Sequence, residues 1–251
     1  MQDPRVVHPS SREAAPTPFI ELLRARAHGW AFVQDNAPAL PAITAGGLLE
    51  GWVDNNMSAG ASVTYAIGVY GPQVNAFTGA TSGNVAGWRG RGTTSRNTTP
   101  VLNPEFSAMI WPQSVTDVRY FFGLYDFDGL ISAGADAITA AHLAFQFSTP
   151  RGDTNWQLSR SNGTTQILVD TVVPFPGSAD PYRPIVEYGG NGTTARARIY
   201  GPDGTTLLYD SGTLTTGLPP ITTGLRTMLG CRTTAVASKQ LSFMHAEIAM
   251  A

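Results

Sequence analysis

The sequence is short of cysteine and lysine, and the shortage of cysteine excludes several classes of protein. Cys231 is the single cysteine and Lys239 the single lysine among 251 residues. One cysteine excludes an intrachain disulfide, and it excludes the usual zinc sites, which take several cysteine or histidine ligands. Cys231 ends a strand-like run, so we expect it to be a buried, small apolar residue.

Charge is also scarce, with 14% of residues charged and a formal net charge of −2. Such a chain has no bulk attraction for nucleic acid, and the Gly/Arg stretch at residues 87–92 holds one tryptophan where a stacking platform needs several aromatic residues. No apolar run approaches the length of a membrane span, and the first residues have no apolar signal core. We therefore expect folding in a cytoplasm, with neither nucleic acid nor a membrane as partner.

Glycine and proline are plentiful, and they separate many short runs of β-branched and aromatic residues. Within residues 142–210 the dividing dipeptides are Asn162-Gly163, Asn191-Gly192 and Asp203-Gly204. These dipeptides favour tight hairpin turns because they tolerate positive φ. The pattern predicts an all-β fold made of antiparallel strands in one sheet or two packed sheets. We expect strands at residues 30–33, 51–53, 62–70, 105–111, 118–125, 142–148, 155–160, 164–170, 183–188, 195–200, 205–210, 225–231 and 240–250, with a loop at 126–141.

The alternation within these strands also predicts which side chains fill the core. The tryptophans Trp88, Trp111 and Trp156 each sit in an alternating strand, so we expect them to be core residues rather than platforms for sugars. The wider core prediction comprises Phe121, Phe145, Phe147, Trp156, Ile167 and Ile199.

The first 28 residues differ from the rest and are predicted to form an extended arm followed by one short helix. Prolines keep the arm extended, and Thr17-Pro18 then provides an N-cap and a first helical residue. The chain is thus divided into residues 1–28, an attachment segment, and residues 29–251, a single sandwich domain. The predicted partner-binding residues are Arg5, Arg12, Phe19, Leu22, Leu23, Arg24 and Arg26.

No pattern in the sequence predicts a catalytic site. Asp126 and Asp128 have the i, i+2 spacing of a carboxylate pair on one strand face, but Gly129 places them at a strand end, where aspartate is a turn former. The Glu-x-Asp-x-x-Glu strand of lectin-like hydrolases is missing. None of the four histidines has a serine or cysteine partner at a recognisable spacing, so no triad is predicted. We expect a protein that is not an enzyme.

Two further patterns near residue 153 have an ordinary explanation. Asp153 and Asn155, with Asp126 and Asp128, are the residue types of a calcium site, but such side chains more often cap turns. The tripeptide Arg151-Gly152-Asp153, which integrins bind, is most simply a hairpin loop. We therefore predict no metal and no cofactor.

The order of several motifs along the chain resembles the concanavalin A-like jelly-roll proteins found among the structural proteins of tailed bacteriophages. The resemblance covers about residues 30–250 and rests on packing and turn signatures. The motifs are Gly87-Trp88-Arg89, Pro104-Glu-Phe, Arg119-Tyr-Phe-Phe-Gly-Leu, Ala144-Phe-Gln-Phe, Gly152-Asp-Thr-Asn-Trp, Asn162-Gly-Thr-Thr, Leu218-Pro and Lys239-Gln-Leu-Ser-Phe.

This resemblance implies two curved antiparallel sheets packed face to face, and it implies a place in a virion. The first expectation is a capsid decoration protein that binds the major capsid protein or other virion proteins on the head surface as an oligomer, most simply a homotrimer. The alternative is a carbohydrate-binding tail adhesin or receptor-binding module on the same fold, with surface glycans as partners. The fold alone does not decide between these roles.

Overall fold

The computed structural model describes residues 30–33, 48–49, 53–55, 58, 60–68, 71–90, 98–126, 136–175 and 180–250. The predicted arm and helix lie outside these residues, so the division of the chain at residue 28 stays a prediction. Asp128 also lies outside them. The same holds for all the predicted attachment residues, Arg5, Arg12, Phe19, Leu22, Leu23, Arg24 and Arg26.

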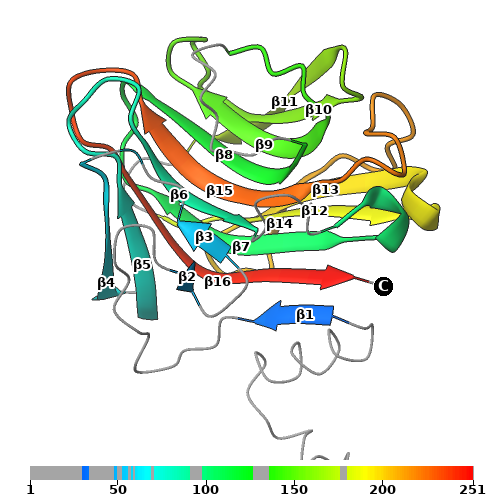
Figure 1. The fold of residues 1–251 in the computed structure, drawn as a ribbon, viewed down its shortest axis with the longest axis horizontal. Helices are drawn as coiled ribbons and strands as arrows, with labels where there is room; N and C mark the ends of the chain where they lie inside the picture. The colour runs from blue at the N-terminus through cyan, green and yellow to red at the C-terminus, as the bar shows by residue number, and fades with distance from the viewer. Residues whose placement is uncertain are drawn as a thin grey trace, which may run out of the picture.

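The described strands form two eight-stranded sheets, here called sheet A and sheet B (Figure 1). Sheet A has the strand order β14-β13-β12-β7-β16-β5-β4, and β1 pairs with β16. Its strands are β14 (Leu207–Asp210), β13 (Thr194–Tyr200), β12 (Arg183–Gly189), β7 (Glu105–Pro112), β16 (Gln240–Met250), β5 (Gly71–Phe77), β4 (Ser62–Gly68) and β1 (Trp30–Val33).

Sheet B has the order β11-β10-β9-β8-β15-β6-β3-β2. Its strands are β11 (Gln166–Pro174), β10 (Asn155–Ser161), β9 (His142–Ser148), β8 (Val118–Tyr125), β15 (Arg226–Thr233), β6 (Val85–Gly90), β3 (Val53–Asn55) and β2 (Leu48–Leu49). Every strand pair in both sheets is antiparallel. The prediction of an all-β jelly-roll sandwich is confirmed. The helical elements of the described residues are two 3-10 turns, η2 (Pro100–Leu102) and η3 (Gly190–Gly192).

The core lies between the two sheets, where alternate residues of each strand meet. Phe106 of β7 stacks on Phe122 of β8, with 4.5 Å between the ring centroids. Burying a side chain of this size stabilises the fold by about 2–3 kcal/mol. The core predictions for Phe145, Phe147, Trp156 and Ile199 are confirmed, and Cys231 is buried with them, which raises the pKa of its thiol.

Phe121 is buried, as predicted, and it belongs to a second apolar cluster on the face of sheet B turned away from sheet A. Two other core predictions need correction. Ile167 is only half-buried, because β11 is the edge strand of sheet B. A neighbouring strand, β10, therefore covers the Ile167 side chain from one side only. Trp111 is also half-buried; it pairs with Ser242, whereas the next residue back, Ile110, pairs with the core residue Phe243. The side chain of Trp88 lies outside the description.

The predicted turns occur, with small changes in the strands beside them. Asn191 and Gly192 both have positive φ, 57° and 82°, as an Asn-Gly turn requires. Gly204 has a φ of 70°, and the Asp203 carboxylate accepts the backbone N–H of Thr205 at 2.9 Å. As a result β14 begins at Leu207 rather than at residue 205. The strand predicted at 164–170 instead begins at Gln166 and continues to Pro174.

Candidate functional site

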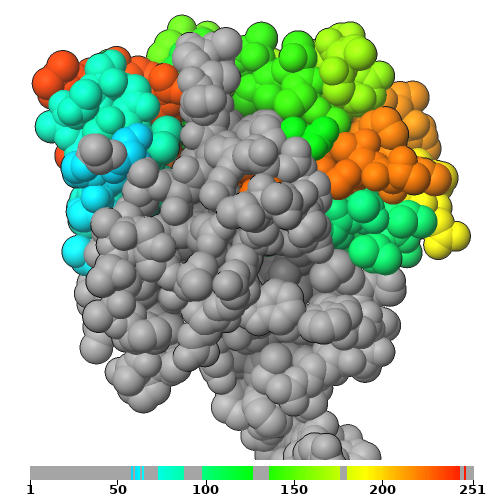
Figure 2. All heavy atoms as spheres, in the orientation of Figure 1, coloured from blue at the N-terminus to red at the C-terminus, as the bar shows by residue number. Residues whose placement is uncertain are grey.

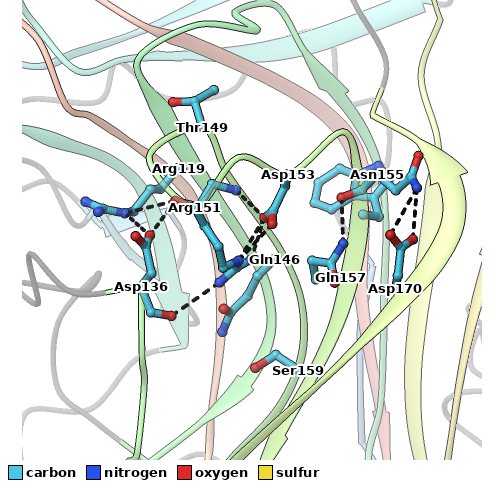
Figure 3. A network of polar contacts seen from close by, with 12 residues as sticks. Arg119, Asp136, Gln146, Thr149, Arg151, Asp153, Asn155, Gln157, Ser159 and Asp170 are labelled. Atoms are coloured by element: carbon cyan, nitrogen blue, oxygen red, sulfur yellow. Dashed lines mark hydrogen bonds and ion pairs between the residues drawn. The ribbon is translucent and has the colours of Figure 1, made fainter.

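The face of sheet B that points away from sheet A is here called the outer face. On neighbouring strands, residues opposite each other in the register point to the same face. Phe121 of β8 lies opposite Gln146 of β9, which lies opposite Gln157 of β10, which lies opposite Asp170 of β11. The row therefore runs from an apolar residue to an exposed carboxylate. Its members Gln146, Gln157 and Asp170 are labelled in Figure 3.

The middle of the outer face is apolar and is covered by the chain that follows β8. Phe121, Tyr125 and Met228 form a buried cluster with Ile138 from that segment. The two strands beneath approach closely at Gly123, whose φ is 155°. A Cβ there would lie 2.5 Å from Cα of Ala144, so only glycine fits. The predicted loop at 126–141 thus takes part in the sheet's packing through its described residues.

Five polar residues at the β9–β10 turn end of the outer face bind one another; they are Arg119, Asp136, Ser148, Arg151 and Asp153, here called the arginine end. All but Ser148 are labelled in Figure 3. Arg119 Nε donates to Asp136 Oδ1 at 2.8 Å and to Ser148 Oγ at 3.3 Å. The Ser148 hydroxyl also donates to Asp136. Arg151 donates to both carboxylate oxygens of Asp153, at 2.8 Å from Nε and 2.5 Å from Nη2.

The charges of the arginine end are satisfied within it. Burial raises the pKa of Asp136, but the hydrogen bonds from Arg119 and Ser148 together lower it by more than burial raises it. The resulting pKa lies below the ordinary value for aspartate. Arg119 is 7% exposed. Asp153 also accepts the backbone N–H of Ser148 at 2.8 Å. Because Arg151 and Asp153 bind each other, the Arg-Gly-Asp tripeptide is closed on itself, as expected of a hairpin loop.

A buried histidine and serine lie farther along the outer face. Ala140 O lies 2.7 Å from Nδ1 of His142 and can only accept, so Nδ1 carries the proton. Burial lowers the pKa of His142 to about 4, so the ring is neutral and Nε2 accepts the hydroxyl of Ser159 at 2.6 Å. Sequence spacing did not reveal this pair, because only the β9–β10 register brings it together. Both side chains are fully buried, so the pair ties two strands together and does not present a nucleophile.

Beside the arginine end, at the edge of sheet B, lie Asn155, Gln157, Asp170 and Val172, here called the bulge end. Asn155 Nδ2 donates to the two carboxylate oxygens of Asp170 at 2.9 and 3.2 Å (Figure 3). The backbone N–H of Val172 donates to Asp170 Oδ1 at 2.7 Å, and this bond is the main reason that the pKa of Asp170 is lowered. Gln157 Nε2 donates to the backbone oxygen of Asn155 at 3.3 Å.

Sequence analysis singled out Asn155 but missed Gln157 and Asp170. A signal was present in β10, where Asn155, Gln157, Ser159 and Ser161 put a polar residue at every second position. Such alternation in a strand whose other positions include Trp156 predicts one polar face and one apolar face. It does not reveal which residues of β11 lie opposite.

The residues that were weighed as calcium ligands and set aside do not come together where the structure describes them. Asp153 is bound to Arg151, Asn155 to Asp170, and the backbone of Asp126 pairs with Ala141. Across the described residues there is no group of three or more His, Cys, Asp or Glu side chains placed to hold a metal ion. A search of those same residues for a helix long and apolar enough to cross a membrane also finds none.

The comparisons with known proteins agree with this fold. No protein-family model and no curated protein sequence matches the chain. Among solved structures, the exoplasmic/lumenal domain of VIP36, bound to Ca²⁺ and Man3GlcNAc, superposes with a TM-score of 0.50 at 11% identity, covering 76% of this chain and 82% of that one. The potassium-bound carbohydrate recognition domain of Emp46p gives 0.51 at 8% identity, covering 87% and 96%. At these identities the likeness shows the fold alone, which is a lectin-like jelly roll.

Proposed function

We propose that this chain is a non-catalytic carbohydrate-binding module, and that it binds glycans on the outer face of sheet B. The exposed and half-buried polar residues of the outer face are the observation that carries the proposal. They present side-chain amides and carboxylates on one side of a rigid sheet, and these groups form hydrogen bonds with sugar hydroxyls. The jelly-roll fold that the chain shares with VIP36 and Emp46p supports this use of the sheet, as an analogy of fold.

The carboxylates of the outer face are unsuited to glycoside hydrolysis. That reaction needs a general acid with a raised pKa beside a second carboxylate. The pKa values of Asp136 and Asp170 are both lowered, so neither is prepared to protonate a leaving group at neutral pH. The Asp153 carboxylate accepts three hydrogen bonds from Arg151 and is thus already paired with a guanidinium. This supports a binding role rather than catalysis.

The role of head decoration receives no comparable support. No comparison points to a virion protein, so the capsid partner, the homotrimer and the virion location rest on the sequence resemblance alone. The alternative from the sequence, a carbohydrate-binding adhesin or receptor-binding module, is the role that the fold neighbours favour. Whether such a module sits on a phage tail stays a prediction.

A glycan array followed by calorimetric titration tests the proposal. The wild-type chain should bind one class of glycan, and Gln157→Ala should weaken that binding by about tenfold, the loss expected for one or two hydrogen bonds. Gln240→Ala is the matched control. Gln240 is also half-buried in a strand, in the other sheet, and its amide bonds a residue two positions away, as that of Gln157 does. No binding by the wild type, or equal losses in both variants, would contradict the proposal.

A further inference from the structure

The edge of sheet B contains a bulge that forces one residue outward. In the β10–β11 pairing, Asn155 lies opposite Pro174 and Gln157 lies opposite Asp170. The single residue Trp156 thus faces three residues, 171–173. The first of these, Thr171, is buried, and its hydroxyl donates to the backbone oxygen of Trp156 at 2.7 Å. The third, Val173, is buried in the core.

The middle residue of the bulge, Val172, is both strained and exposed. Its φ is 54°, a region that β-branched residues avoid, and its side chain is 78% exposed. Glycine or asparagine would adopt this backbone without strain. A strained residue at a bulge points to a function that its side chain serves, since neither burial nor turn geometry calls for valine here. The yellow-green atoms of β10 and β11 reach the surface in Figure 2.

Hydrogen-bond acceptors lie near this valine, since its backbone N–H binds Asp170 and Asn155 binds the same carboxylate. The amide groups of Asn155 and Gln157 act as donors in the bonds described above, and within the described residues no hydrogen bond reaches either side-chain oxygen. The carboxylate of Asp170 is exposed and ionised at neutral pH. The bulge end therefore offers three acceptor side chains beside one exposed isopropyl group.

We propose that the bulge end binds a neutral sugar that presents two adjacent hydroxyl groups; this inference rests on the proposed function. The hydroxyls donate to the side-chain oxygens of Asp170, Asn155 and Gln157, and the sugar's C–H face packs on Val172. Acidic sugars are excluded, because a carboxylate or sulfate would lie beside Asp170 and would bring no donor. The arginine end does not compensate for this, since its two carboxylates already pair with Arg119 and Arg151.

Two variants test the site, with the glycan that the array identifies for the wild-type chain as the probe. Asp170→Asn should weaken binding by about tenfold or more, because it removes the charge that strengthens hydrogen bonds from the sugar. Val172→Gly should weaken binding by about fivefold, the loss expected for a contact of this size, while the melting temperature stays equal or rises. A purely structural role for Val172 would not lower affinity in a protein that is at least as stable. Val236→Gly, which removes an equally exposed valine from the β15–β16 loop, should change neither quantity.

The outcomes separate this inference from the proposed function. A wild-type chain that binds no glycan overturns both. Glycan binding that falls with Gln157→Ala but is unchanged in Asp170→Asn and Val172→Gly overturns the bulge site and leaves the module intact. An array in which the bound glycans all carry carboxylates or sulfates contradicts the proposal that the ligand is a neutral sugar. Loss of binding in EDTA would overturn direct recognition by these side chains, which needs no metal ion.

Discussion

The arginine end and the bulge end of the outer face lie side by side and both contain carboxylates, but the two clusters use them differently. At the arginine end, each carboxylate meets a guanidinium, and the five side chains bond one another. At the bulge end, a carboxylate meets amides, and the amide oxygens stay available to a ligand. The arginine end is largely buried around Arg119, whereas the bulge end is open at Asp170 and Val172.

This difference shows that polarity alone does not identify a binding site. A polar cluster whose members satisfy one another gains little from a ligand, because binding must first break bonds that already exist. A cluster with unused acceptors on paired strands loses less conformational entropy when a ligand binds, because the strands already fix its geometry. The comparison predicts that variants at the arginine end change stability, whereas variants at the bulge end change affinity.

The largest loss in the free energy of unfolding is expected from a variant in the core beneath the outer face. The losses at the arginine end and the bulge end are compared with it. Phe145 is fully buried between the sheets. Phe145→Ala should lower the free energy of unfolding by about 3–5 kcal/mol, the cost of the lost contacts and the remaining cavity. Urea denaturation measures it, and a loss below about 1 kcal/mol would mean that the inner face of β9 is assigned wrongly.

Breaking the arginine end should cost nearly as much. Asp136→Ala leaves the guanidinium of Arg119 buried without its carboxylate, and we expect a loss of about 3 kcal/mol. Asp170→Ala at the bulge end removes an exposed carboxylate and should cost about 1 kcal/mol. The two variants are measured together by urea denaturation. Equal losses would show that the two ends do not differ in the way proposed.

The stability of the arginine end should also depend on pH. The pKa of Asp136 is lowered in the folded chain, so its contribution is present above the unfolded value of about 4 and is lost as the pH falls through the folded pKa. Asp136→Asn should therefore flatten the decline in the free energy of unfolding below about pH 4. Denaturation at a series of pH values measures this, and parallel curves for the two proteins would contradict it.

The smallest effect is a gain. Val172→Gly relieves the positive φ but makes the unfolded chain more flexible, and the two terms partly cancel. We expect the free energy of unfolding to rise by up to about 1 kcal/mol in thermal or urea denaturation. A loss of more than about 1 kcal/mol would show that the valine is needed for folding.

The sequence predicted most of the strands but missed β5 and β6, and alternation is a local property of each run. The runs at 118–125 and 142–148 match β8 and β9. In β9 the inward phenylalanines Phe145 and Phe147 were identified from the alternation, whereas in β8 Phe121 was predicted and the inward residue is Phe122. Whether a strand lies at the edge of a sheet depends on how the strands pair, which is why Ile167 was placed too deep in the core. Which face of the sheet a side chain lies on also depends on that pairing, so Trp111 was assigned to the wrong face.

The candidate site could be predicted only in part, because it depends on how strands pair. Asn155 was recognised as a polar residue beside a turn, but its partner Asp170 lies on the next strand and becomes a neighbour through the register. The bulge at Val172 exists only as a mismatch between two strands, and no single run of residues records it. Asp136 was hidden in a segment predicted as a loop, and its role follows from the position of Arg119.

Strand β16 has a consequence for the order in which the protein forms. It lies in the middle of sheet A, between β7 and β5, and also pairs with β1. On the ribosome, the β4–β5 hairpin and the strands β7, β12, β13 and β14 are made first and cannot join until residues 240–250 emerge. The pairing of β16 with β5 spans more than half of the chain, and contacts this distant in sequence form slowly. A nascent chain that stops before residue 240 would hold two unpaired sheet edges facing the same gap, and such edges recruit strands from other molecules.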